Sequence, residues 1–145
     1  MVEPEHQDLQ RALAARVVRD DDGGLDLRAP LLVAGADVAW RGDLARAAVT
    51  VMRLPSLEVV EEVVVERPIE AEYVPGSFAL RELPPLRAAL ARLRARPDVL
   101  LCDGHGVAPP RRCGLASQLG LELDLRTIGC AKTILVGSHG PLGAA

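Results

Sequence analysis

The residues best placed to do chemistry lie between Val99 and Arg112. The apolar run that opens this stretch predicts a short buried strand ending at Asp103, and a glycine-bracketed histidine, His105, and a pair of arginines follow directly. Because ligands and metals collect beyond the carboxyl ends of strands in α/β domains, Asp103 is well placed to hold a cation. Glycine has no Cβ, so the loop can let a phosphate or a base approach the backbone closely. His105 could serve as a base or a phosphate partner, or be an ordinary polar loop residue.

Two further acids occupy positions that suggest a shared role. Asp37 lies inside the apolar stretch Leu31–Trp40, where a charge is expensive unless it is paired or bound to a metal. Glu82 lies near the start of a predicted helix between the two strands. Three carboxylates converging from two strands and a helix would suit Mg²⁺ or Mn²⁺, which can activate water and stabilise the leaving oxygen of a phosphodiester. The alternatives are a turn or cap role for Asp37, a cap or loop role for Asp103 and a solvated helix position for Glu82.

The composition limits the classes of protein to which the chain can belong. It has 145 residues, 49% hydrophobic and 26% charged, which is enough for one globular domain with a core. The net charge of −3 argues against binding nucleic acid through bulk charge alone. Lys132 is the only lysine, and both a contact with phosphate and simple surface exposure are open for it.

The cysteines and the hydropathy predict a cytoplasmic protein. Cys102, Cys113 and Cys130 match no zinc spacing, and their odd number argues against a disulfide framework. The polar, acidic N-terminus does not resemble a signal peptide, and no apolar run reaches the length of a membrane span. We therefore expect a cytoplasmic location and no membrane partner, and the oligomeric state stays open.

Hydrophobic periodicity and turn residues predict an α/β domain. Three strands, two of them joined as a hairpin, precede an alternation of helices and strands, and this order predicts a mixed sheet with helices packed on it. The expected segments are a helix at 4–18, strands at 31–40, 45–54 and 57–66, a helix at 78–95, a strand at 98–102, a helix at 111–119 and a strand around 127–128. Residues 132–136 begin another ordered segment and 137–145 are an expected irregular tail. We therefore expect a domain at 1–136 that lacks its C-terminal helices.

An ordered set of short motifs resembles the endonuclease V family, nucleases that act on strands containing deaminated adenine, which is inosine. Each motif is weak alone, but the set follows the family's order and spacing over about residues 5–136. The motifs are Val33-Ala-Gly-Ala-Asp37-Val, Tyr73-Val-Pro-Gly76, Arg81-Glu82, Asp103-Gly-His-Gly, Pro110-Arg-Arg, Gly114-Leu-Ala-Ser and Ile128-Gly-Cys-Ala-Lys132. The resemblance implies a ribonuclease H-like fold, a mixed five-stranded sheet with flanking helices.

The resemblance also implies roles for single residues. Asp37, Glu82 and Asp103 match the carboxylates that bind Mg²⁺, for which Mn²⁺ can substitute, and Lys132 matches a lysine near the phosphate. Tyr73 matches a wedge that enters the space left by the displaced base. Backbone positions lining the pocket for that base match Gly76, Gly104 and Gly129. The implied function is cleavage of single- or double-stranded DNA, or RNA, to the 3′ side of inosine, in DNA repair.

The chain departs from the family's pattern at three positions. Pro109 stands where the family usually has a histidine before Pro-Arg-Arg, Gln118 where a helix histidine is common, and Glu72 where a proline precedes the wedge tyrosine. Two alternatives therefore stay open beside the endonuclease. One is a catalytically impaired or inactive homologue that at most binds inosine-containing nucleic acid, and the other is a ribonuclease H-like nuclease with a different substrate.

Overall fold

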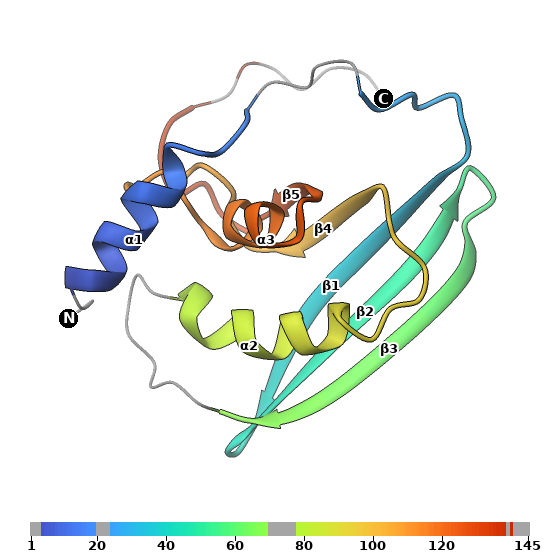
Figure 1. Cartoon of the computed structure of the whole chain (residues 1–145), viewed down its shortest axis with the longest axis horizontal. Coiled ribbons are helices and arrows are strands. Elements are labelled where there is room, and N and C mark those ends of the chain that lie inside the picture. Colours follow the sequence, from blue (N-terminus) through green and yellow to red (C-terminus); the bar gives the residue numbers. More distant parts are fainter. Residues whose placement is uncertain (1–3, 20–23, 70–77, 139, 141–145) are drawn as a thin grey trace.

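A computed structural model of the chain describes residues 4–19, 24–69, 78–138 and 140 (Figure 1). Tyr73 and Gly76, the expected wedge and one expected pocket residue, lie outside the described residues, as do most of the expected tail and Glu72. Among the described helices, none is long and apolar enough to cross a membrane.

The described strands form one mixed five-stranded sheet in the order β3-β2-β1-β4-β5. The long strands β1 (Leu31–Arg41), β2 (Leu44–Leu54) and β3 (Glu58–Pro68) make an antiparallel meander. The short strands β4 (Val99–Asp103) and β5 (Arg126–Cys130) continue the sheet parallel to β1. The expected sheet is confirmed, and its strand positions agree with the sequence pattern to within one or two residues at most ends.

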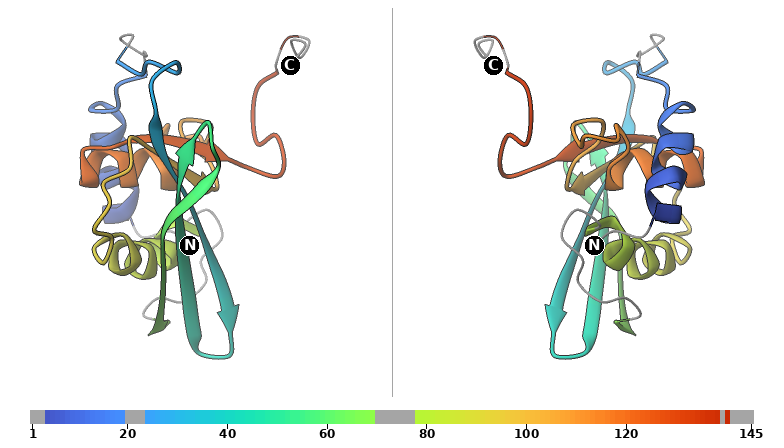
Figure 2. Two further views of the ribbon diagram at one scale, coloured as in Figure 1. Left: turned by 90° about the vertical axis from the view of Figure 1, so that its right-hand side faces the viewer. Right: turned by 90° about the vertical axis from the view of Figure 1, so that its left-hand side faces the viewer.

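The helices α1 (Pro4–Ala14), α2 (Phe78–Leu90) and α3 (Leu115–Leu123) lie on one side of the sheet (Figure 2). The side views show the segment after β5 leading away on the other side. Alternation along each strand sends one set of side chains under the helices and the other to the opposite face. The core beneath the helices is built from small and branched residues, among them Ala34, Ala36, Ala47, Val49, Val51, Leu86, Leu100 and Leu119. The other face carries exposed side chains that include Val64 and Ile128.

The helix predicted at 111–119 was misplaced, because α3 begins at Leu115 and ends at Leu123. Arg112 has a φ of 60° and Gly114 is extended, so the backbone before Leu115 cannot be helical. Asp124 ends the helix in the left-handed conformation, with its N–H directed to the carbonyl of Gly120.

Two other predicted helices were longer than those observed, and a third predicted segment is not regular. The first helix ends at Ala14 and the second at Leu90, although Pro84 and Pro85 lie inside the latter. Residues 132–136 form no helix or strand. In each case the apolar spacing continues beyond the point where the backbone stops being helical or extended.

The end of α2 is tied to β3 by Glu61. Its carboxylate accepts the backbone N–H groups of Arg94, at 3.0 Å, and Ala95, at 2.8 Å. These bonds occupy the backbone donors that a longer helix would have used. The hydrogen bond from Ala95, followed by that from Arg94, lowers the pKa of Glu61 below its ordinary value of 4.5.

This capping interaction predicts a pH-dependent contribution to stability. Because the folded pKa of Glu61 lies below the unfolded one, the contribution is complete above pH 4.5 and disappears as the pH falls through the folded value. Glu61→Gln should therefore lower the urea midpoint at about pH 6, and the difference from wild type should shrink toward about pH 3. Glu62→Gln is the matched control, because that side chain lies on the other face and accepts only a 3.4 Å bond from the Thr50 hydroxyl among the described contacts. A difference that does not depend on pH would contradict the assignment.

Candidate active site

Asp37 and Asp103 lie side by side on the face of the sheet opposite the helices. β1 and β4 are parallel, with Ala36 paired to Cys102, so the following residue of each strand is Asp37 or Asp103. Ala36 and Cys102 are buried under the helices, and alternation turns both carboxylates to the other face. The strand order thus brings together two acids that are far apart in the sequence.

A shallow, open depression of about 580 Å³ surrounds these two carboxylates. Its floor comes from β1, β2 and β4, and its rim from the end of β5 and the residues after it. Thr50, Cys130 and Lys132 contribute to its lining beside the two aspartates. A depression of this shape admits a large ligand from solvent rather than enclosing a small one.

Lys132 places a positive charge beside Asp103. Its Nζ lies 2.8 Å from Oδ2 of Asp103, and the lysine side chain is 85% exposed whereas that of Asp103 is 35% exposed. The hydrogen bond to Asp103 raises the pKa of Lys132, and the charges of Asp103, Asp37 and Glu82 add to this effect. The lysine is therefore an ammonium held by a cluster of negative charge.

Glu82 lies on the inner face of α2, buried to 6% exposure. Helical spacing places it with the buried Ala79, Leu83 and Leu86. The preceding residue, Arg81, stacks on the Trp40 ring of β1 at 4.6 Å, which fixes the start of the helix against the sheet. The position of Glu82 is thus set by core packing on one side and by this stack on the other.

Burial raises the pKa of Glu82 to about 7, and the charges of Asp103 and Asp37 contribute to the rise. The three acids predicted to act together are therefore electrostatically coupled. No three His, Cys, Asp or Glu side chains within the described ranges are grouped closely enough to hold a metal ion. Convergence of all three carboxylates on one point stays a prediction, while the pairing of two of them is observed.

The donor chemistry of this region fits a hard divalent cation. Carboxylate oxygens are the ligands that Mg²⁺ and Mn²⁺ prefer. The Lys132 ammonium stands beside Asp103 as a cation would. Burial is the main cause of the raised pKa of Glu82, and the negative charges of Asp103 and Asp37, which a cation would offset, add to it.

The loop that follows Asp103 is held by close backbone contacts. Gly104 has a φ of +150°, the N–H of Gly114 donates to the carbonyl of Gly106 at 2.7 Å, and that of Ala116 donates to the carbonyl of His105 at 3.2 Å. The N-terminus of α3 is therefore engaged by the loop's own carbonyls. His105 is half-buried in this loop.

Two glycines make this close packing possible. A Cβ on Gly129 would lie 2.5 Å from the Gly106 nitrogen and 2.6 Å from the Gly104 oxygen. A Cβ on Gly114 would lie 2.3 Å from the His105 oxygen. Gly104 and Gly129, the expected pocket residues, thus lie together. Position 129 must be glycine because the neighbouring loop leaves no room for a Cβ. The motif quoted around Gly114 did not reveal this packing role.

Gln10 is a further residue whose role the sequence pattern missed. The helical period of the first segment predicts an inward Leu9, yet Leu9 is 47% exposed and Gln10 only 4%. The Gln10 side chain donates to the carbonyl of Cys113 at 3.3 Å and accepts from Nε of Arg111. Gln10 thus joins α1 to the loop that contains Arg111. The only sign of this role in the sequence was a polar residue on the apolar face of the predicted helix.

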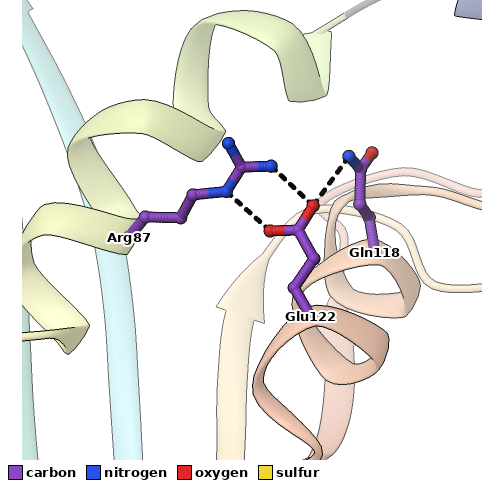
Figure 3. Close-up of polar contacts among 3 residues, drawn as sticks. All are labelled: Arg87, Gln118 and Glu122. Atoms are coloured by element: carbon purple, nitrogen blue, oxygen red, sulfur yellow. Dashed lines mark hydrogen bonds and ion pairs between the residues drawn. The ribbon is translucent and has the colours of Figure 1, made fainter.

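Gln118 takes part in packing between α2 and α3 (Figure 3). Its amide donates to Glu122 at 3.0 Å, and Glu122 receives two bonds from Arg87 of α2, at 2.6 and 2.5 Å. The oxygen of the Gln118 amide, Oε1, is buried and accepts no hydrogen bond from the residues that the structure describes. Gln118, which stands in place of a histidine, therefore orients the Glu122 carboxylate that joins α3 to Arg87 of α2.

Comparison with known proteins decides the family. The sequence matches the Endonuclease V family model over residues 11–145. The chain belongs to the endonuclease V family. Among similar sequences, Endonuclease V of Roseiflexus sp. (strain RS-1) is 49% identical over 134 residues, which cover 92% of this chain and 58% of that protein. Endonuclease V of Nostoc sp. (strain PCC 7120 / SAG 25.82 / UTEX 2576) is 41% identical over 90% of this chain and 59% of that protein.

Solved structures of endonuclease V share the fold. The structure of Endonuclease V from Streptomyces avermitilis has a TM-score of 0.84 and 38% identity, and the match covers 100% of this chain and 64% of that chain. Endonuclease V of Ciona intestinalis, in complex with a 24mer DNA containing an inosine followed by a ribo-adenosine, has a TM-score of 0.81 and 32% identity over 90% of this chain and 58% of that one. The chain thus spans less than two thirds of the length of these endonuclease V relatives.

Proposed function

We propose that the chain carries the catalytic site of a metal-dependent endonuclease that cleaves nucleic acid to the 3′ side of inosine. The observation that carries the proposal is the pairing of Asp37 with Asp103 on the open face of the sheet, with a cationic group beside them. Membership of the endonuclease V family supports the same activity. The depression around the two acids is open to solvent, so a nucleic-acid strand would reach them from outside.

Asp37, Asp103 and Glu82 would hold the metal. Bound Mg²⁺ or Mn²⁺ supplies an activated water and stabilises the leaving oxygen of the phosphodiester. Asp37 and Asp103 lie together on one face of the sheet, and Glu82, buried on α2, would supply the third carboxylate. Lys132, which lines the depression, would contact a phosphate of the substrate.

Recognition of the substrate would be local rather than spread over a charged face. The net charge of −3 offers little general attraction for a polyanion. Tyr73 would act as the wedge, and Gly76, Gly104 and Gly129 would line the site of the displaced base. The complex of the Ciona relative with inosine-containing DNA supports this substrate class. We place the activity in DNA repair in the cytoplasm, a setting with which three unpaired cysteines agree.

The test is cleavage of a single-stranded oligonucleotide that contains one inosine, with an otherwise identical adenosine strand as the control. We expect product from the inosine strand with Mg²⁺ or Mn²⁺ and none with a chelator. Duplex DNA and RNA of the same sequence would establish the preferred partner. Tyr73→Ala should reduce the rate greatly, and Tyr73→Phe should retain it, because the wedge needs an aromatic ring and not a hydroxyl.

A second candidate is an inactive homologue that binds inosine-containing strands without cutting them. It is favoured by the absence of a three-ligand group in the described part of the chain, and by Pro109 at the place of a family histidine. Metal-independent preference for the inosine strand with no product would support it. Equal cleavage of both strands, unaffected by Tyr73→Ala, would instead indicate a related nuclease with another substrate.

A further inference from the structure

The only lysine of the chain occupies a carboxylate that the proposed metal site needs. We propose that Lys132 is the resident counter-cation of the Asp37–Asp103 pair, and that a divalent cation binds as Lys132 releases Asp103. Loading of the metal and release of the lysine would then be one coupled event. This inference rests on the metal site of the proposed function.

The geometry makes the two cations competitors. Nζ of Lys132 lies 2.8 Å from Oδ2 of Asp103, inside the depression that also contains Asp37. A divalent cation bound between Asp37 and Asp103 would lie within a few ångströms of that ammonium. Like charges at such a separation repel, and both cations would bind the same Asp103 carboxylate, so each weakens the binding of the other.

Lys132 is also able to leave. Its side chain is 85% exposed, and residues 131–138 form no helix or strand, so turning it into water breaks no buried contact. Exposed ion pairs contribute little stability, which makes the lysine easy to displace by an ion of twice its charge. Every other strongly basic side chain of the sequence is arginine. A lysine has a compact charge on a flexible side chain. It does not form the bidentate hydrogen bonds with which an arginine would bind the carboxylate.

Release would give Lys132 its second role. Freed from Asp103, the ammonium stays on the rim of the same depression, where a phosphate would lie next to the metal. The lysine would therefore become available to the substrate only once the cation is in place.

The first test measures Mn²⁺ binding without substrate, by electron paramagnetic resonance of the free ion. Lys132→Met removes the competing charge and keeps a side chain of similar length, so it should bind Mn²⁺ about three- to fivefold more tightly than wild type. Lys132→Arg keeps the charge and should not bind Mn²⁺ more tightly than wild type. Asp37→Asn should weaken binding in both the wild-type and the Lys132→Met backgrounds.

The second test uses the fact that the chain has one lysine. Labelling with carbon-13 lysine gives a single side-chain Cε signal in the nuclear magnetic resonance spectrum, and Asp103→Asn provides the signal of the unpaired lysine. Titration with Mg²⁺ should move the wild-type signal toward that reference. The same addition should leave the signal of Asp103→Asn in place.

Three outcomes would overturn the inference. Equal Mn²⁺ affinity of wild type and Lys132→Met would do so while leaving the metal site intact. A Cε signal that does not move although Mg²⁺ binds would have the same meaning. Failure of wild type and every variant to bind Mn²⁺ would remove both the inference and the metal site of the proposed function.

Discussion

Asp103→Asn should abolish metal-supported cleavage of the inosine strand while the chain stays folded. The amide keeps the shape of the side chain but loses the charge that would hold the cation, and we expect a loss of rate on the order of a thousandfold. Folding should change little, because two effects oppose each other. The exposed ion pair with Lys132 is lost, which costs little, and repulsion from Asp37 and Glu82 is relieved.

The matched control is Asp124→Asn. Asp124 undergoes the same chemical change at the C-terminal end of α3, where its left-handed φ of 49° is one that asparagine also tolerates. Cleavage rates under saturating Mg²⁺ and urea unfolding curves are measured for both variants. Retained cleavage in Asp103→Asn would remove that residue from the metal site, and unfolding of the variant would make it a structural cap.

Gly129→Ala should destabilise the chain by about 3 kcal/mol, at the upper end of the usual cost of overpacking. The new methyl group would lie 2.5 Å from the Gly106 nitrogen and 2.6 Å from the Gly104 oxygen. Both neighbours are backbone atoms of a loop whose His105 and Gly106 carbonyls accept the N–H groups of Ala116 and Gly114, so no flexible side chain can move aside. The loop must shift, and because it directly follows Asp103 we expect weaker Mn²⁺ binding as well.

Gly35→Ala is the control for this substitution. Gly35 lies in β1 of the same sheet, and an added Cβ there meets no atom within 4 Å. Its unfolding free energy should stay the same or rise by up to about 1 kcal/mol, since alanine restricts the unfolded chain more than glycine does. Urea denaturation of both variants checks the prediction, and equal destabilisation of the two would refute the packing role assigned to Gly129.

Asp37 and Asp103 were recognisable in the sequence because each lies within or at the end of an apolar strand, whereas their adjacency depends on the parallel pairing of β1 with β4. An acid within or at the end of an apolar strand, together with period-two alternation, places both side chains on one face. The contacts of Gln10 and Gly114 were not accessible in this way. Each depends on a partner that comes close only through the tertiary fold, Arg111 and His105 respectively.

The limits of the strands were easier to predict than those of the helices for the same reason. Turn residues mark the ends of the meander directly in the sequence. The end of α2 is instead fixed from β3, through the carboxylate of Glu61, and the start of α3 by the backbone of the loop after Asp103. The spacing of apolar residues along the sequence does not predict hydrogen bonds between such distant residues.

The strand order also determines when in folding the candidate site is completed. The meander joins neighbours in the sequence, whereas the bond from Leu32 to Asp98, next to the β1–β4 pairing, closes a separation of 66 residues. Long loops cost more entropy to close, so we expect the meander to form early and β4 to dock late. Asp37 belongs to the early unit and Asp103 to the late one. A cation that binds both aspartates would link the part of the sheet that forms early to the part that docks late. It would slow the separation of the two parts, and the stability of the chain would rise with the concentration of the cation.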